Sequence, residues 1–93
     1  MSIKIHIPTP LRPFCDQQDE VVINDATDVS NVFDKLVSQY SGLSAHLFDE
    51  DNNLRKFVNV YLNEEDIRYI DGVNSSVKDG DVISIVPSIA GGI

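Results

Sequence analysis

The chain has little of what marks secreted and membrane proteins. Cysteine occurs once in 93 residues, at Cys15, so no disulfide can form within the chain. A single unpaired thiol fits a reducing compartment. The amino-terminal stretch MSIKIHIPTP alternates apolar and polar residues and lacks the long apolar run of a signal peptide or a membrane span. We therefore expect a cytoplasmic protein with no membrane association.

Basic residues are also scarce. The chain has 7 Lys and Arg against 15 Asp and Glu, which gives a net charge of −8. This balance repels phosphate backbones and anionic lipid headgroups, and therefore argues against nucleic acid and membranes as partners. The excess of acid is compatible with steering toward a basic patch on a protein partner, and equally with a surface that is simply kept soluble.

The motifs that hold metals are incomplete. The stretch DEDNNL, which starts at Asp49, begins like a calcium loop. Its sixth position is Leu54, where the turn requires glycine, and its twelfth is Val60, where a bidentate glutamate belongs. The two histidines, His6 and His46, are far apart in sequence and have no clustered thiolates beside them. We therefore expect no metal site on this chain.

Residues for catalysis are similarly lacking. Cys15 is followed by Asp16, and a carboxylate raises the pKa of a neighbouring thiol, which makes the sulfur a poorer nucleophile. The acidic stretch at 64–66 follows a predicted strand, where a turn with exposed charges is expected. No glycine-rich loop joins a strand to a helix, so nucleotide binding is not indicated. We expect a protein that is not an enzyme and binds no cofactor itself.

The first half of the chain predicts two strands and a helix. Isoleucines alternate with polar residues over 3–7, which is the period of a half-buried strand. Three prolines predict a loop over 8–14, and EVVIN at 20–24 predicts a second strand that forms a hairpin with the first. The stretch 25–42 predicts a helix that begins at Thr27 or Asp28 and ends at Gly42. Its buried face consists of Val29, Val32, Phe33, Leu36, Val37 and Tyr40.

The second half predicts further strands. A short irregular turn at 43–48 and a polar loop at 49–53 lead to an alternating strand over 56–63. A short edge strand is expected at 67–70, and the last strand, at 82–86, stops at Pro87. The order β-β-α-β-β-β, with one main helix, predicts an α+β domain over 1–87. It matches the ubiquitin-like β-grasp, a mixed sheet of four to five strands whose first and last strands lie parallel at the centre.

The residues after Pro87 carry no turn or helix signal. Five extended residues, Ser88 to Gly92, could reach roughly 17 Å from the domain, far enough to thread into a partner's cleft. The pair Gly91-Gly92 after Ala90 would allow close approach by another protein. We therefore predict a flexible tail at 88–93, although many proteins end in a frayed polar terminus.

The stretch KDGDVISIVPSIAGG, residues 78–92, resembles the carboxy-terminal signature of the MoaD/ThiS family of sulfur carriers. In that signature an Asp-Gly-Asp turn leads into the last strand, a proline and a Gly-Gly tail. Two further stretches, IPTPLRPF at 7–14 and RKFVNVYLNEEDIRY at 55–69, resemble the carriers for cysteine biosynthesis, the CysO type. The length of 93 residues also fits that subgroup.

The resemblance implies a role for Gly92. A ubiquitin-activating-type adenylyltransferase would use ATP to adenylate its carboxylate, and sulfur would then displace AMP to leave a thiocarboxylate. In the cysteine branch this sulfur adds to an activated serine on a synthase that depends on pyridoxal phosphate (PLP). A JAMM-type zinc metallopeptidase then releases cysteine. ATP, zinc and PLP therefore belong to the partners.

The sequence departs from the mature family pattern because Ile93 follows Gly92. The hypothesis is that a peptidase removes Ile93 to expose Gly92; otherwise Ile93 is an artefact or the chain is a non-functional relative. Two other functions remain open. The chain could be the small subunit of molybdopterin synthase, with its tail held by the large subunit, or a ubiquitin-like modifier attached to lysines through Gly92.

The outer face of the predicted sheet offers a candidate docking patch. If Val58, Val60, Leu62, Ile83 and Ile85 face the helix, then Phe57, Tyr61 and Val86 point the other way. An apolar trio opposite the core would suit the activating enzyme or the synthase. Scattered exposed hydrophobic residues are also common on proteins without such a role.

Overall fold

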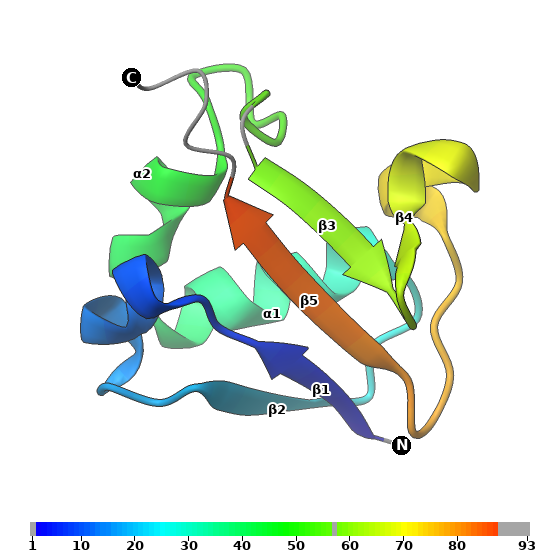
Figure 1. Cartoon of the computed structure of the whole chain (residues 1–93), viewed down its shortest axis with the longest axis horizontal. Helices are drawn as coiled ribbons and strands as arrows, with labels where there is room; N and C mark the ends of the chain where they lie inside the picture. The colour runs from blue at the N-terminus through cyan, green and yellow to red at the C-terminus, as the bar shows by residue number, and fades with distance from the viewer. Residues whose placement is uncertain (1, 57, 88–93) are drawn as a thin grey trace.

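In the computed structural model, the described residues, 2–56 and 58–87, form a five-stranded sheet with helical segments packed on one face (Figure 1). The strands are β1 (Ser2–His6), β2 (Glu20–Asn24), β3 (Val58–Leu62), β4 (Glu65–Asp66) and β5 (Val82–Pro87). The helical segments are η1 (Thr9–Cys15), α1 (Val29–Gln39), η2 (Ser41–Leu43), α2 (Ser44–Leu47), η3 (Ile67–Tyr69) and η4 (Gly72–Asn74), where η marks a 3₁₀-helix.

The sheet is mixed, and its strand order is β2-β1-β5-β3-β4. β1 pairs in parallel with β5, so that Lys4 lies opposite Val82 and Ile5 opposite Ile83. β2 joins β1 and β3 joins β5 in antiparallel pairs, and the first two strands form the expected hairpin. The prediction of parallel first and last strands at the centre is confirmed, and the fold is the ubiquitin-like β-grasp.

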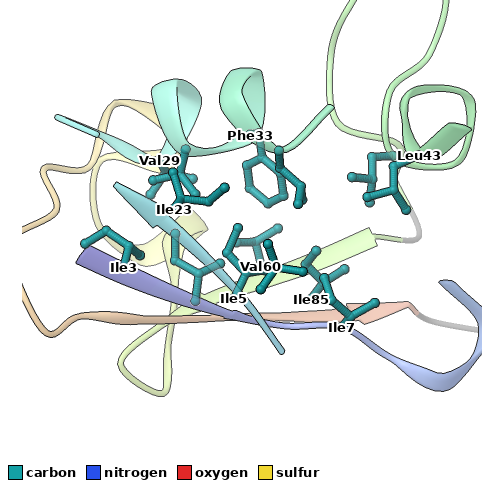
Figure 2. Packing of buried hydrophobic residues seen from close by; sticks show 14 of the residues in the cluster. Ile3, Ile5, Ile7, Ile23, Val29, Phe33, Leu43, Val60 and Ile85 are labelled. Carbon is teal, nitrogen blue, oxygen red and sulfur yellow. The ribbon is translucent and has the colours of Figure 1, made fainter. Parts of the chain in front are cut away.

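The core lies between the sheet and α1. Figure 2 shows the isoleucines of β1 directed toward Val29 and Phe33 of the helix. Ile3 and Ile5 have no exposed surface, and Phe33 is 1% exposed. Burying one such side chain contributes about 1.5–3 kcal/mol relative to leaving it in water. The period-2 pattern of β1 therefore sets which face of the central strand is covered.

α1 begins where the sequence indicated. Asp28 is the N-cap, and its carboxylate accepts a hydrogen bond of 2.7 Å from the backbone N–H of Asn31. Four residues of the predicted apolar face are fully buried, while Val37 and Tyr40 are partly buried against the core. The predicted starting point and the predicted buried face are therefore both confirmed.

The predicted end of this helix was wrong. α1 stops at Gln39, and Tyr40 is the C-cap, with its N–H donating to the carbonyl of Leu36. Gly42 lies in η2 and does not cap α1. The stretch predicted as an irregular turn, 43–48, instead contains the one-turn helix α2, which buries Leu47 completely. After α1 the chain tightens into the 3₁₀-helix η2, so α2 follows almost directly. The end of α1 therefore needs no glycine in the left-handed conformation.

The loop predicted for 8–14 is instead the 3₁₀-helix η1. Proline is compatible with a first helical turn because its φ is already helical and its missing N–H needs no partner there. η1 buries Leu11 and Cys15, and it ends at Asp16 in the left-handed conformation, with a φ of 53°. The prolines therefore shape a segment that closes one end of the core.

The edge strand predicted at 67–70 was also wrong. The edge strand is β4, two residues long, and Ile67–Tyr69 is the 3₁₀-helix η3. Asn63 and Glu64 turn the chain between β3 and β4 with φ values of 50° and 74°, as a tight two-residue hairpin turn requires. The acidic stretch at 64–66 was expected to be a turn with exposed charges; Glu64 and Glu65 are exposed, but Asp66 is 8% exposed.

Replacing Asp28 with Ala should lower the free energy of unfolding by about 1 kcal/mol, because the N–H of Asn31 loses its acceptor. Urea unfolding followed by circular dichroism measures this change. Asp28→Asn keeps an acceptor and should lose much less. Asp34 lies on the exposed face of the same helix, so Asp34→Ala is the matched control. Equal losses for Asp28→Ala and Asp34→Ala would contradict the capping role.

Candidate functional site: the last strand and the uncovered sheet face

The predicted tail follows a strand that is paired on both sides. β5 lies between β1 and β3, and Ile83 and Ile85 anchor it in the core with 0% and 3% exposure. Its last residue, Pro87, lies opposite Val58 at the start of β3. Residue Phe57 of the predicted docking patch and the tail residues Ala90, Gly91, Gly92 and Ile93 lie outside the described residues. β5 is therefore the fixed base from which the tail sequence continues.

A carboxylate clamp holds the beginning of β5. Asp81 is 6% exposed, and its Oδ2 accepts a hydrogen bond of 2.9 Å from the backbone N–H of Lys78. Its Oδ1 accepts another, also of 2.9 Å, from the side-chain amide of Asn63. The Oδ1 of Asn63 in turn accepts from the N–H of Val82 at 2.9 Å. The end of β3 and the beginning of β5 are therefore joined by side-chain hydrogen bonds as well as by the backbone hydrogen bonds between the two strands.

The same turn also holds the start of β1. Gly80 donates its N–H to the carbonyl of Ser2 at 2.9 Å, and the N–H of Ser2 donates to Oδ1 of Asp79 at 2.7 Å. Gly80 has a φ of 89°, a conformation that side-chain-bearing residues rarely adopt. The turn Asp79-Gly80-Asp81 thus has a structural role: it fixes the start of β5, at the other end of the strand from the tail. Asp79-Gly80 was predicted as a turn, but the partnership of Asp81 with Asn63 carried no signal in the sequence.

The predicted division of the sheet into two faces is observed. The five residues expected to face the helix are all buried. On the uncovered face Val86 is 44% exposed and Tyr61 is half-buried. Val86 lies opposite Asn59, two residues before Tyr61 on β3, so the two side chains are diagonal neighbours. These two members of the predicted docking patch are therefore brought together, and their role in docking stays a prediction.

Polar groups also lie on the uncovered face. His6, on β1, lies opposite Ser84, and its Nε2 is 3.4 Å from Oε2 of Glu20 on β2. A shallow hollow of about 450 Å³ lies beside them and is lined in part by Ser84 and Val82. The face is therefore mixed in character, with single apolar side chains set between hydrogen-bonding groups.

The one thiol is placed in the core. Cys15 has no exposed surface, and burial, together with the charge of Asp16, raises the pKa of its thiol above the ordinary value. The neutral thiol is a weak nucleophile, so Cys15 acts as a small apolar core residue. Across residues 2–56 and 58–87, no group of three or more His, Cys, Asp or Glu side chains is arranged to hold a metal ion.

Asp66 is buried and forms an ion pair with Arg68, whose side chain is 64% exposed. Its Oδ2 lies 2.6 Å from Nη2 of Arg68, and its Oδ1 accepts from the backbone N–H of Arg68 at 2.9 Å. The hydrogen bonds and charge of Arg68 hold the pKa of Asp66 below the ordinary aspartate value. This pair fixes the start of η3 against β3.

Fold and sequence together define a small ubiquitin-like protein with a Gly-Gly pair beyond its last strand, and known proteins are similar to it over most of its length. The sulfur carrier protein CysO of Mycobacterium tuberculosis is 38% identical over 99% of this chain and 100% of its own length. The small archaeal modifier protein 3 of Haloferax volcanii is 34% identical over 75% of each chain. The crystal structure of the Amycolatopsis orientalis BexX/CysO complex contains a chain that matches with a TM-score of 0.85 at 36% identity, over 96% of this chain and 98% of that one.

The chain belongs to the ThiS family, whose model matches residues 5–92. It is therefore a sulfur carrier protein of the ThiS/CysO type, a protein cosubstrate rather than an enzyme. The matched region runs through Gly92 and stops before Ile93. In the part of the chain that the structure describes, no helix is long and apolar enough to cross a membrane.

Gly80→Ala should lower the free energy of unfolding by about 1 kcal/mol or more, because alanine is strained at positive φ. An added Cβ would have no heavy atom within 4 Å, so the loss would report backbone strain alone. Chemical denaturation measures it. Gly80→Asn is the matched variant and should lose less, since Asn tolerates this region better. An unchanged stability in Gly80→Ala would contradict this account of the turn.

Arg68→Gln should remove a pH-dependent part of the stability. Because the folded-state pKa of Asp66 is depressed, the pair stabilises the fold above the unfolded pKa of aspartate, and this contribution is lost as the pH falls through the folded pKa. The difference between wild type and Arg68→Gln should therefore be largest near neutral pH and shrink in acid. Lys78→Gln removes the same charge elsewhere and controls for net charge. A difference between wild type and Arg68→Gln that stays constant with pH would refute the role of the pair.

Proposed function

We propose that this chain carries sulfur as a thiocarboxylate on Gly92 and delivers it for cysteine biosynthesis. The observation that carries the proposal is the similarity to CysO over the full length of both chains. It is supported by the match to the ThiS family through Gly92 and by the place of Gly91-Gly92 a few residues beyond the central strand. Gly92 has no side chain to crowd the carboxylate that reacts.

In the first stage, an adenylyltransferase of the ubiquitin-activating type forms the activated acyl group. An oxygen of the Gly92 carboxylate attacks the α-phosphorus of ATP, and pyrophosphate leaves. A sulfide or persulfide sulfur then attacks the acyl carbon, and AMP leaves with the electron pair of the broken bond. With a persulfide donor, the sulfur–sulfur bond is also cleaved by reduction with a thiol. The product is a thiocarboxylate at the end of the tail.

In the second stage, on a PLP-dependent synthase, the thiocarboxylate sulfur bonds to the β-carbon of an activated serine. The activated side-chain oxygen leaves with the electron pair of the broken carbon–oxygen bond. The acyl group then moves from sulfur to the neighbouring amine and leaves a Gly92–cysteine amide. A JAMM-type zinc metallopeptidase adds water across this amide, so that cysteine is released and the Gly92 carboxylate is restored. ATP, PLP and zinc act in the partner enzymes, and this chain supplies the tail and the surface that docks it.

Ile93 must be removed before the first stage. While Ile93 is present the free carboxylate belongs to a residue with a branched side chain, which crowds the approach of the activating enzyme. The proposed order is therefore cleavage of the Gly92–Ile93 bond by a peptidase and then adenylation of Gly92.

A second candidate is a ubiquitin-like modifier joined to lysines through Gly92. The similarity to the small archaeal modifier protein 3 over three quarters of each chain favours it. A modifier forms isopeptide bonds to many proteins, whereas a carrier for cysteine biosynthesis ends in a thiocarboxylate or a single cysteine. The small subunit of molybdopterin synthase would instead copurify with a large subunit.

The deciding measurement is the intact mass of the chain isolated from its native cells under sulfur limitation. We expect the loss of one isoleucine residue and the exchange of one terminal oxygen for sulfur. Addition of a cysteine residue after incubation with the synthase fraction would identify the cysteine branch. The full-length chain with an ordinary carboxylate, under both sulfur limitation and plenty, would refute the proposal, and isopeptide-linked ladders would favour the modifier.

Removal of Ile93 is tested separately with purified activating enzyme and two chains, one ending at Gly92 and one at Ile93. The chain ending at Gly92 should support ATP–pyrophosphate exchange, and the longer chain should not. A chain that ends at position 92 and carries the substitution Gly92→Val is the control for crowding, and its ATP–pyrophosphate exchange should be slow. Equal exchange by the chains ending at Gly92 and Ile93 would contradict the need for trimming.

A further inference from the structure

A groove lies between α1 and the loop that follows α2, on the side of the sheet that the helices cover. It has a volume of about 310 Å³, at the lower end of the range for ligand sites. α1 contributes Ser30, Asp34 and Val37 to its lining, and the loop contributes Phe48 and Leu54. The helix residues are four and three positions apart, so they share one face of α1. We call this feature the α1 groove.

Hydrogen bonds within the loop hold its side of the groove in place. Phe48 and Leu54 form an antiparallel bridge across the loop. Between them, Asp49 donates its N–H to the carbonyl of Asn53 at 2.9 Å, and its Oδ1 accepts from the N–H of Asn53 at 3.1 Å. Phe48 also packs edge-to-face against Phe33 of α1, with the ring centroids 6.1 Å apart. The groove is therefore already formed in the isolated domain.

The lining combines an apolar floor with oxygen-bearing groups. Phe33 is buried, and Val37 and Phe48 are partly buried against the core, so each presents little apolar surface beyond the groove. Neutral side chains with oxygens that can accept hydrogen bonds also line it: Ser30, Ser44, Asn52 and Asn53. Such a lining suits a side chain that has an apolar stem and a head that donates hydrogen bonds.

The charge of Asp34 selects a cationic head. Asp34 is exposed, and no ion pair within residues 2–56 and 58–87 involves it. The residues three and four positions away on the helix are all uncharged: Ser30, Asn31, Val37 and Ser38. Lys35 is adjacent in sequence, but adjacent residues of a helix do not face each other. Of the described residues, no basic one lines the groove. The groove is therefore complementary to a cation.

Arginine matches this lining better than lysine does. Its methylene stem can lie on Val37 and Phe48, and its planar guanidinium presents several N–H donors to the oxygens of Asp34 and Asn53. The ammonium of lysine is compact and more strongly hydrated, so it loses more on leaving water. Val73 also lines the groove and is 37% exposed, which offers a contact to an apolar residue beside the arginine.

We propose that the α1 groove binds an arginine of a partner protein, together with an apolar residue beside it in the partner's sequence. The stem of the arginine would lie on Val37 and Phe48, and its guanidinium would bond to Asp34. The apolar neighbour would contact Val73. These residues belong neither to the tail sequence nor to the predicted docking patch on the uncovered face, so the inference goes beyond the proposed function.

A second copy of this chain fits less well as the occupant. Each of its three arginines already has a partner within the fold. Arg12 donates to the carbonyl of Ile7, Arg55 to that of Ala45, and Arg68 to the carboxylate of Asp66. Each copy also has a net charge of −8, which opposes association. A segment of another protein with a free arginine avoids both conflicts.

The test uses the full chain labelled with ¹⁵N and the capped peptide acetyl-Leu-Arg-Leu-amide, at a salt concentration of about 0.15 M that screens distant charges. We expect saturable shifts of the amide signals of Asp34, Val37 and Asn53. Asp34→Asn should weaken binding about two- to fivefold, as expected for an exposed ion pair. Asp19→Asn removes the same charge from an exposed residue outside the groove and should leave the affinity unchanged.

The apolar contact is tested with Val73→Ser, which should weaken binding about two- to fivefold because the neighbour of the arginine loses apolar surface. Val22→Ser is the matched control, since Val22 is 47% exposed on β2 and does not line the groove. Equal affinities of these two variants for the peptide would contradict the contact with Val73. Equal affinities of Asp34→Asn and Asp19→Asn would overturn the proposal as a whole.

Three further ligands separate recognition of an arginine segment from simple charge attraction. The peptide with citrulline in place of arginine keeps the shape but is neutral, and the peptide with serine in place of each leucine keeps only the charge. Acetyl-arginine-amide supplies the cation without a segment. Each should bind at least about twofold more weakly than the first peptide.

Equal binding of any of these three ligands would overturn the proposal. So would the absence of shifts at millimolar peptide, shifts confined to residues outside the groove, or self-association of the chain through the groove. None of these outcomes depends on the chemistry of Gly92, so a failure here leaves the proposed function standing.

Discussion

The parallel pairing of β1 with β5 is the constraint on which the rest of the structure depends. It joins residues nearly the whole length of the chain apart, such as Lys4 with Val82. Closing so long a loop costs conformational entropy, which only contacts formed after closure can offset. The alternating isoleucines of both strands supply these contacts against α1, and the turn at Gly80 adds a hydrogen bond to Ser2. The hairpin, the helix and β3 all pack around this pair.

This arrangement separates the functions of the surface. The helix side of the sheet contains the core, and the uncovered face carries Tyr61 and Val86. The tail sequence follows a strand that is held by neighbours on both sides. Under the proposed function, in which Gly92 carries the sulfur, such separation would let each partner enzyme bind the folded domain without covering the reacting group.

The sequence predicted the parts of the fold that depend on local periodicity. The alternation in β1, β2, β3 and β5 placed each strand to within about two residues, and the cap at Asp28 placed the start of α1. The 3₁₀ segments were missed because their short turns leave no periodic signal, and the prolines of η1 read as breakers. The contact of Asp81 with Asn63 joins residues that are distant in sequence, so it became visible only once β3 had been placed beside β5.

The central place of β5 has a consequence for how the protein is made. Synthesis proceeds from the amino terminus, so β5 leaves the ribosome after every other element described here, and the sheet has no centre until it arrives. A chain cut short before β5 would expose the apolar faces of β1 and β3 and become a substrate for proteases. A chain that ends before β5 is therefore not expected to fold into a stable domain. A partner that recognises the folded domain would then bind only chains whose synthesis has passed the last strand.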